Sequence, residues 1–211
     1  MGSVIKALFL IFKPLETWER ILQDQRSVVY LLFRYLLPMM VLAAGAEVFG
    51  LIVWGQKQAG MHRIHKFTMN EAVTYEAVRS LVLVVVVVIC ALLIKMFGET
   101  FRRRHTWRQT FTLVIFGLSP IFLLRLVDAA PGINPCITWA IGMMLCLEVI
   151  YQGLPRVMEP DPPNAIGLFF MSALMLVAVT GLERFMTYWY LSGHIRPMGT
   201  AVACVVAKLS L

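Results

Sequence analysis

Residues 111–150, FTLVIFGLSPIFLLRLVDAAPGINPCITWAIGMMLCLEVI, decide the fold. Two apolar runs, each near the roughly 20 residues that cross a bilayer, flank a turn that cannot continue as a helix because it contains Pro131, Gly132, Asn134 and Pro135. Gly117 and Pro120 interrupt the first run, and a membrane helix tolerates such a break where a neighbour bonds the released carbonyl. The stretch therefore predicts a hairpin of two membrane-spanning helices with the other segments packed around it.

The composition extends this interpretation to the whole chain of 211 residues. Hydrophobic residues make up 59%, charged residues only 15%, and the mean hydropathy is +0.76. Soluble domains are nearer half apolar and a quarter charged, so the composition indicates an integral membrane protein. The formal charge of +7 comes from basic residues in short loops beside apolar runs, which the positive-inside rule explains without nucleic acid as a partner.

Five apolar stretches predict an all-α, polytopic bundle of five transmembrane helices with an interfacial, amphipathic N-terminal helix. We expect an N-terminal segment over 1–26, spans over 27–54, 80–97, 108–128, 135–153 and 165–190, and a C-terminal tail over 191–211. The β-branched run 81–89 is expected to be helical, because lipid offers the backbone no other partners. The polar connection Gly55–Arg79 contains a helix-start signal at Asn70, so the second span could begin outside the membrane.

The N-terminal segment has helical periodicity between Leu15 and Asp24. One face carries the apolar side chains of Leu15, Trp18, Ile21 and Leu22, and the remaining positions are polar. This pattern predicts a helix that lies on the membrane surface. The alternative is a soluble helix docked on the loops.

The distribution of Lys and Arg predicts the orientation. With five spans, ten basic residues fall on the N-terminal side: Lys6, Lys13, Arg20, Arg26, Lys95, Arg102, Arg103, Arg104, Arg108 and Arg156. Six fall on the other side: Lys57, Arg63, Lys66, Arg79, Arg196 and Lys208. We therefore expect a cytoplasmic N-terminus and a C-terminus on the opposite side.

Charged residues inside the spans are the candidate site. They are Arg34, Glu47, Arg125, Glu148, Glu183 and Arg184, with Asp128 at a span end. Because a charge at mid-membrane costs about 2.5–3.5 kcal/mol, each is expected to face protein and have a partner. Depth along the helices predicts an Arg34–Glu148 pair in the inner half. It also predicts an outer cluster of Glu47 and Arg125 with Glu183 or Arg184. These charges would be interhelical ties or a proton or ion path.

No constellation for catalysis, metal or a cofactor emerges from the remaining motifs. His62 and His65 lack further ligands, and the sequence Gly117-Leu-Ser-Pro has no histidine base in any span. Cysteines 90 and 146 are expected to be buried in spans, and nothing in the spacing of Cys136 and Cys204 supports a disulfide. The sequence therefore predicts a protein that is not an enzyme.

Several short motifs resemble one family of membrane proteins. Thr106-Trp-Arg-Gln-Thr-Phe, Leu118-Ser-Pro, the Pro-rich turn, Tyr151-Gln-Gly-Leu-Pro-Arg-Val-Met and the opening Pro14-Leu-Glu-Thr-Trp are similar to the YIP family, which comprises Ypt/Rab-interacting, Golgi-type proteins and their short bacterial relatives. The resemblance implies a non-enzymatic role in membrane organisation, trafficking or scaffolding. The eukaryotic branch carries a long N-terminal region, whereas about 26 residues precede the first span here, which argues against a Rab-type GTPase as a partner.

The short form resembles the bacterial relatives, which implies the cell inner membrane as its location. The expected partners are the lipid bilayer and other membrane proteins or a second copy of the chain. The alternative function is a transporter of ions or small solutes, or an accessory subunit of a larger complex. A transporter requires a water-accessible cavity near mid-membrane lined by the intramembrane charges, whereas a scaffold requires closed packing there.

Overall fold

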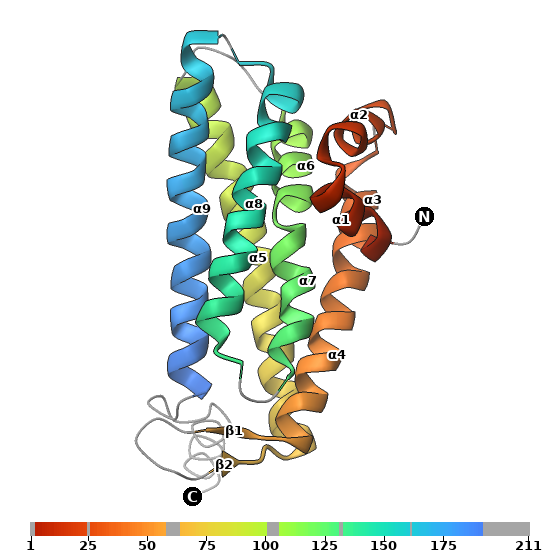
Figure 1. The fold of residues 1–211 in the computed structure, drawn as a ribbon, viewed down its shortest axis with the longest axis vertical. Helices are drawn as coiled ribbons and strands as arrows, with labels where there is room; N and C mark the ends of the chain where they lie inside the picture. Colours follow the sequence, from red (N-terminus) through yellow and green to blue (C-terminus); the bar gives the residue numbers. More distant parts are fainter. Residues whose placement is uncertain are drawn as a thin grey trace, which may run out of the picture.

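Five long helical segments form the body of the protein in the computed structural model, which describes residues 3–24, 26–57, 64–100, 106–130, 133–160 and 162–191 (Figure 1). The segments long and apolar enough to cross a membrane are Val28–Val53, Met69–Thr100, Trp107–Asp128, Pro135–Met158 and Asn164–Tyr190. Neighbours in sequence run in opposite directions (Figure 1). The predicted all-α fold with five spans is confirmed.

The first span contains a π-helical turn. It consists of α3 (Val28–Leu31), the π-helix η1 (Leu32–Leu36) and α4 (Leu37–Val53). Proline cannot donate a helix hydrogen bond, and Pro38 lies two residues after Leu36, the last residue of the turn. The amide of Leu37 instead reaches back to the carbonyl of Leu32, five residues earlier. The helix is thus widened around Arg34 and Tyr35.

The second span begins eleven residues before the expected start at residue 80. The two-residue strands β1 (Gln56–Lys57) and β2 (Ile64–His65) pair antiparallel, and α5 (Met69–Thr100) follows. Thr68 caps it, because its amide donates to Glu71 Oε2 at 2.9 Å and its hydroxyl oxygen accepts from the Glu71 amide at 3.4 Å. Residues in this first part of α5 belong to the bundle and not to the polar connection, as the burial of Ala72 and Arg79 shows.

The third span is the centre of the bundle. It consists of α6 (Trp107–Gly117) and α7 (Ser119–Asp128), and 72% of its apolar window is buried, against 22% for the last span. The helix breaks at Leu118, where Pro120 removes a donor. The Ser119 hydroxyl donates to the Ile115 carbonyl at 3.2 Å and bonds the Tyr35 hydroxyl at 2.7 Å. Ser119, at the start of α7, therefore bonds a backbone carbonyl of α6 across the break, and Tyr35 of η1 holds the Ser119 hydroxyl in place.

The fourth and fifth spans complete the bundle. The helix α8 (Pro135–Met158) packs along α6 and α7, which is the predicted hairpin, and α9 (Pro162–Leu191) packs on α5 and α8. The helix α8 continues past the expected end at residue 153, since Pro155 lies in its last turn and the Arg156 guanidinium donates to the Gln152 carbonyl at 2.8 Å. It ends at Glu159, whose φ of 40° is left-handed.

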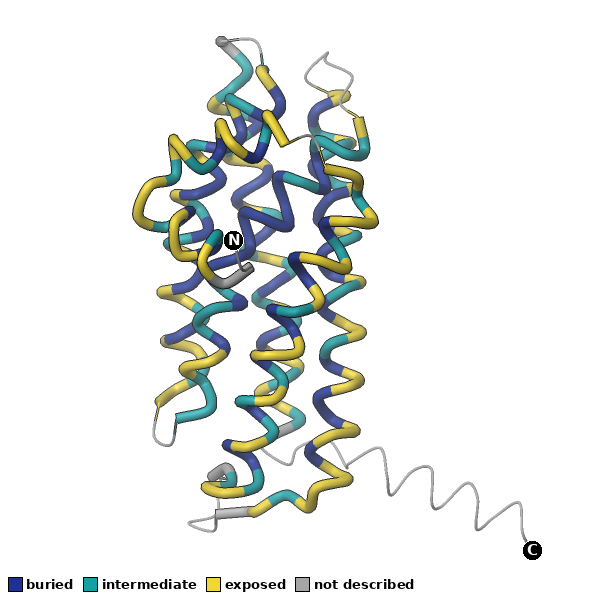
Figure 2. Tube along the Cα trace, turned by 90° about the vertical axis from the view of Figure 1, so that its right-hand side faces the viewer, coloured by how far each residue is buried: buried dark blue, intermediate teal, exposed yellow. Residues whose placement is uncertain are grey.

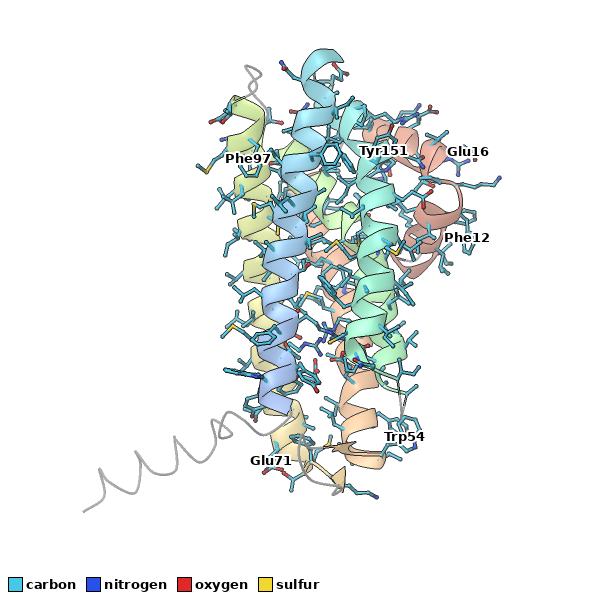
Figure 3. The ribbon with its side chains drawn as sticks, turned by 60° about the vertical axis from the view of Figure 1, so that its left-hand side comes forward. Phe12, Glu16, Trp54, Glu71, Phe97 and Tyr151 are labelled. Atoms are coloured by element: carbon cyan, nitrogen blue, oxygen red, sulfur yellow. The ribbon has the colours of Figure 1, made fainter. Side chains whose placement is uncertain are left out.

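The N-terminal helices α1 (Ser3–Phe12) and α2 (Pro14–Asp24) pack beside one end of the bundle (Figure 1). Trp18 is 0% exposed, and its indole nitrogen donates to the Val149 carbonyl at 3.1 Å. The ring lies where a Cβ on Gly153 would be. Ile21 is also buried and Leu22 is partly buried, whereas Leu15 is 48% exposed. The apolar face of α2 is therefore turned mainly to protein, because the indole finds a carbonyl partner there. Phe12 and Glu16 project outward (Figure 3).

Exposed residues follow the outer faces of the long helices (Figure 2), and many of them are large hydrophobic residues. We call the end that holds α2, Thr100 and Met158 the α2 end, and the end that holds Trp54 and Glu71 the opposite end (Figures 1 and 3). Several residues of the sequence analysis lie outside the described residues: His62, Arg63, Arg102, Arg103, Arg104, Pro131, Gly132, Arg196, Cys204 and Lys208.

Candidate functional site

Five charged side chains from four helices meet inside the half of the bundle toward the opposite end. No side chain among them is more than 8% exposed. We call this set the charge network: Glu47 on α4, Glu76 and Arg79 on α5, Arg125 on α7 and Glu183 on α9. Removing so many charges from water is expensive unless each has a partner, so the geometry of their pairing determines what the site can do.

Glu47 is the centre of the charge network. Arg79 Nη1 donates to Glu47 Oε2 at 2.5 Å, and Arg125 Nη2 donates to the same oxygen at 2.8 Å. Arg125 Nε approaches Glu47 Oε1 at 3.4 Å, which completes a two-pronged contact. One carboxylate on α4 therefore holds both α5 and α7.

The other two carboxylates share the same guanidinium groups. Arg125 Nη2 lies 3.0 Å from Glu76 Oε2, and Arg79 Nη1 lies 3.5 Å from Glu76 Oε1. Arg79 Nε donates to Glu183 Oε1 at 3.3 Å, and that oxygen also accepts from the Thr187 hydroxyl at 3.0 Å. Two guanidinium groups thus face three carboxyl groups, and the charge network joins α4, α5, α7 and α9.

A second, smaller cluster lies beside it. Arg184 on α9 pairs with Asp128 at the end of α7 and bonds the Pro135 carbonyl at 3.0 Å from Nε and 2.8 Å from Nη2. The Thr138 hydroxyl donates to Asp128 and accepts from Arg184 Nη2 at 3.3 Å. This cluster fixes the start of α8 against its two neighbours.

The structure brings together most of the expected outer cluster. Glu47 and Arg125 are in direct contact, and Glu183 joins them through Arg79, whereas Arg184 turns to Asp128. Sequence reasoning missed Glu76 and Arg79, since both fell in the expected polar connection. A signal was available, because Ala72, Glu76, Arg79, Leu83 and Val86 have the three-to-four-residue spacing of one helix face.

The structure does not bring Arg34 and Glu148 together. Among the described side chains, no ion pair joins these two residues. Because α8 extends to Met158, Glu148 lies about 15 Å from the α2 end of its helix, whereas Arg34 lies about 9 Å from the start of α3. Glu148 is exposed on α8, on the same outward stripe as Met144 and Tyr151. Depth alone was therefore a poor guide, since the two side chains also differ in the direction they face.

The members of the charge network pair with one another, although Glu76 Oε1 and Arg125 Nη1 are buried without a hydrogen-bond partner among the described residues. Two cavities of about 1150 and 260 Å³ open at the α2 end, and neither is lined by a residue of the network. Within the described residues, no group of three or more His, Cys, Asp or Glu side chains could hold a metal ion. The arrangement suits a rigid interhelical tie.

The fold and the buried charges define the class of this protein, which is a polytopic α-helical integral membrane protein. A family model, the Yip1 domain, matches residues 8–182. The chain belongs to the Yip1 domain family, and the resemblance seen in its motifs is confirmed. Neither the comparison with curated proteins nor the comparison with solved structures gave a match.

Proposed function

We propose that this Yip1-domain protein is a non-enzymatic scaffold that organises other proteins in its membrane. The observation that carries the proposal is the mutual pairing within the charge network: each of its five side chains is buried and lies within ion-pair distance of at least one other member. A transporter would instead need these groups to line a water-filled cavity that opens alternately to each side. A bundle tied across four helices favours a fixed body to which partners bind.

The partner surface that we propose is the outward stripe of α8 around Glu148. Met144 and Tyr151 flank this carboxyl group on consecutive turns and are 73% and 62% exposed. A carboxylate facing lipid near the middle of a helix is costly. A partner helix with a Lys or Arg at that depth would remove the cost, and the partner is either another membrane protein or a second copy of the chain.

We also propose the inner membrane as its location, with the N-terminus in the cytoplasm. Arg79 is buried in the charge network and no longer counts as a loop residue. Without Arg79, the count expected from the sequence becomes five basic residues on the outer side against ten on the N-terminal side, so the asymmetry that supports a cytoplasmic N-terminus increases.

Site-specific photo-cross-linking in native membranes tests the partner surface. A photoreactive amino acid replaces Met144 or Tyr151 on the proposed surface, and Leu174 on α9, which is 69% exposed, is the matched control. We expect a discrete cross-linked adduct from the α8 positions, and its loss in a Glu148→Leu background. Equal labelling from Leu174, or adducts that persist without Glu148, would contradict the proposed surface.

Reconstitution in liposomes tests whether the protein conducts protons or cations through the charge network. Purified protein in liposomes that contain a pH-sensitive dye should carry no proton or cation flux above that of protein-free liposomes under an imposed gradient. Flux that disappears in a Glu76→Gln variant, which keeps the shape of the side chain, would establish transport instead.

A further inference from the structure

The larger cavity is a strongly basic pocket at the α2 end. Its volume is about 1150 Å³, and it lies among α1, α2, η1 and α6. Among the described residues, five cationic side chains from five separate stretches line it, with a single carboxylate: Lys6, Arg20, Arg26, Arg34, Arg108 and Asp24. We call this the basic cavity, and from it we propose that the protein binds the phosphate headgroup of an anionic phospholipid there, an inference that does not depend on the scaffold function.

The charge balance of the basic cavity favours an anion. Asp24 is shared between Lys6 and Arg26, each at 3.7 Å, so it serves two cations at once. Arg26 also stacks over the Tyr30 ring at 5.0 Å, and Arg108 Nε donates to the Arg26 carbonyl at 3.0 Å. These contacts hold several cationic groups close together, and Asp24 is the one carboxylate in the part of the cavity lining that the structure describes. A phosphate group would offset their mutual repulsion and accept several charge-assisted hydrogen bonds.

The backbone contributes to this site through η1. The π-helical turn contains Arg34, which lines the basic cavity together with Tyr35 and Pro38. Such turns widen a helix locally and are frequent at functional sites. Pro38, which has no backbone donor, follows the turn two residues later and lines the same side of the basic cavity.

The surroundings of the basic cavity fit a lipid better than a soluble anion. The residues that line it include Ile21, Leu31 and Phe116, whose side chains are buried. From its rim an outward apolar stripe runs along the first span through Tyr30, Phe33, Leu37 and Val41, all exposed. Arg26 and Arg108 lie at the ends of the first and third spans, the level at which Lys and Arg meet anionic headgroups. A headgroup in the cavity would leave its acyl chains along this stripe.

Binding of short-chain lipids to the purified full-length protein in neutral detergent tests the proposal. Dioctanoyl phosphatidylglycerol carries the anionic phosphate, and dioctanoyl phosphatidylcholine is the zwitterionic control with identical chains. Glycerol 3-phosphate and inorganic phosphate represent soluble sources. We expect saturable binding of the anionic lipid only, weakening as ionic strength rises.

Charge-removing variants locate the site. Arg20→Gln and Arg34→Gln change exposed side chains that line the basic cavity, and Lys95→Gln removes a charge from α5 outside it. With about 1 kcal/mol per basic residue near an anionic surface, each cavity variant should bind about fivefold more weakly and the double variant roughly twenty-five-fold. Arg34→Lys should retain most of the affinity, and Lys95→Gln all of it.

Three results would overturn the proposal. They are unchanged affinity in the double variant, equal binding of the zwitterionic lipid, and binding of glycerol 3-phosphate as tight as that of the anionic lipid. A folded variant should elute as a single species in detergent. If the double variant does not, the Arg20→Gln variant alone decides between the outcomes.

Discussion

Replacing Arg125 by methionine should be among the most damaging single changes to this bundle. Its guanidinium group contacts Glu47 at 2.8 Å and Glu76 at 3.0 Å, and its side chain is 3% exposed. Methionine keeps much of the side-chain length and no charge. The substitution leaves Arg79 alone to face three carboxyl groups inside the bundle.

The expected loss is about 3–5 kcal/mol in the free energy of unfolding, the usual cost of removing one partner from a buried ion pair. Removing Glu47 as well, in the double variant Arg125→Met and Glu47→Met, takes away both partners. The double variant should therefore lose at least 1 kcal/mol less than the sum of its two single variants, because pairs in direct contact are coupled.

Unfolding of the purified protein in mixed micelles, by titration with a denaturing detergent, measures these free energies. Lys95→Met is the matched control. Lys95 lies 3.8 Å from Glu99 on the exposed surface of α5, and such a pair contributes only about 0.3–0.5 kcal/mol. A loss below about 1 kcal/mol for Arg125→Met, or losses that simply add in the double variant, would show that the charge network does not hold the helices together.

Two further substitutions test the packing described above. Gly153→Ala should lower the free energy of unfolding by about 1–3 kcal/mol, because a Cβ there overlaps the ring of Trp18. Gly45→Ala has open space and should be neutral or stabilising in the same denaturation titration. Ser119→Ala should cost about 1–3 kcal/mol, since it leaves the buried Tyr35 hydroxyl without its partner. Tyr35→Phe in the Ser119→Ala background should recover part of that loss, and a further loss of similar size would contradict the hydrogen bond.

The spans were predictable because their signal is additive over many residues. A span can be recognised from the length and composition of an apolar run alone. The first, third and fifth spans lie within a few residues of their expected bounds. The hairpin of the third and fourth spans was expected to be central, and the third span is the most buried of the five. Helix ends were harder where polar residues belong to a helix, as at the start of α5, because a charged residue near an end suggests water even when a partner buries it.

The charge partners were only half predictable, for a physical reason. Depth follows from the rise per residue, which placed Glu47, Arg125 and Glu183 in the same layer. The direction that a side chain faces depends on how each helix is rotated against its neighbours, and one sequence does not contain that rotation. Glu148 shows the consequence, because it points outward from α8.

Docking of Trp18 on α8 has a consequence for biogenesis. The indole nitrogen donates to a carbonyl 131 residues further along the chain, so this contact cannot form until four spans have left the ribosome and entered the membrane. Residues that are synthesised first therefore reach their final contacts late, after most of the bundle has been made. A chain truncated before Val149 would lack the carbonyl that accepts this hydrogen bond, so Trp18 would have no partner there.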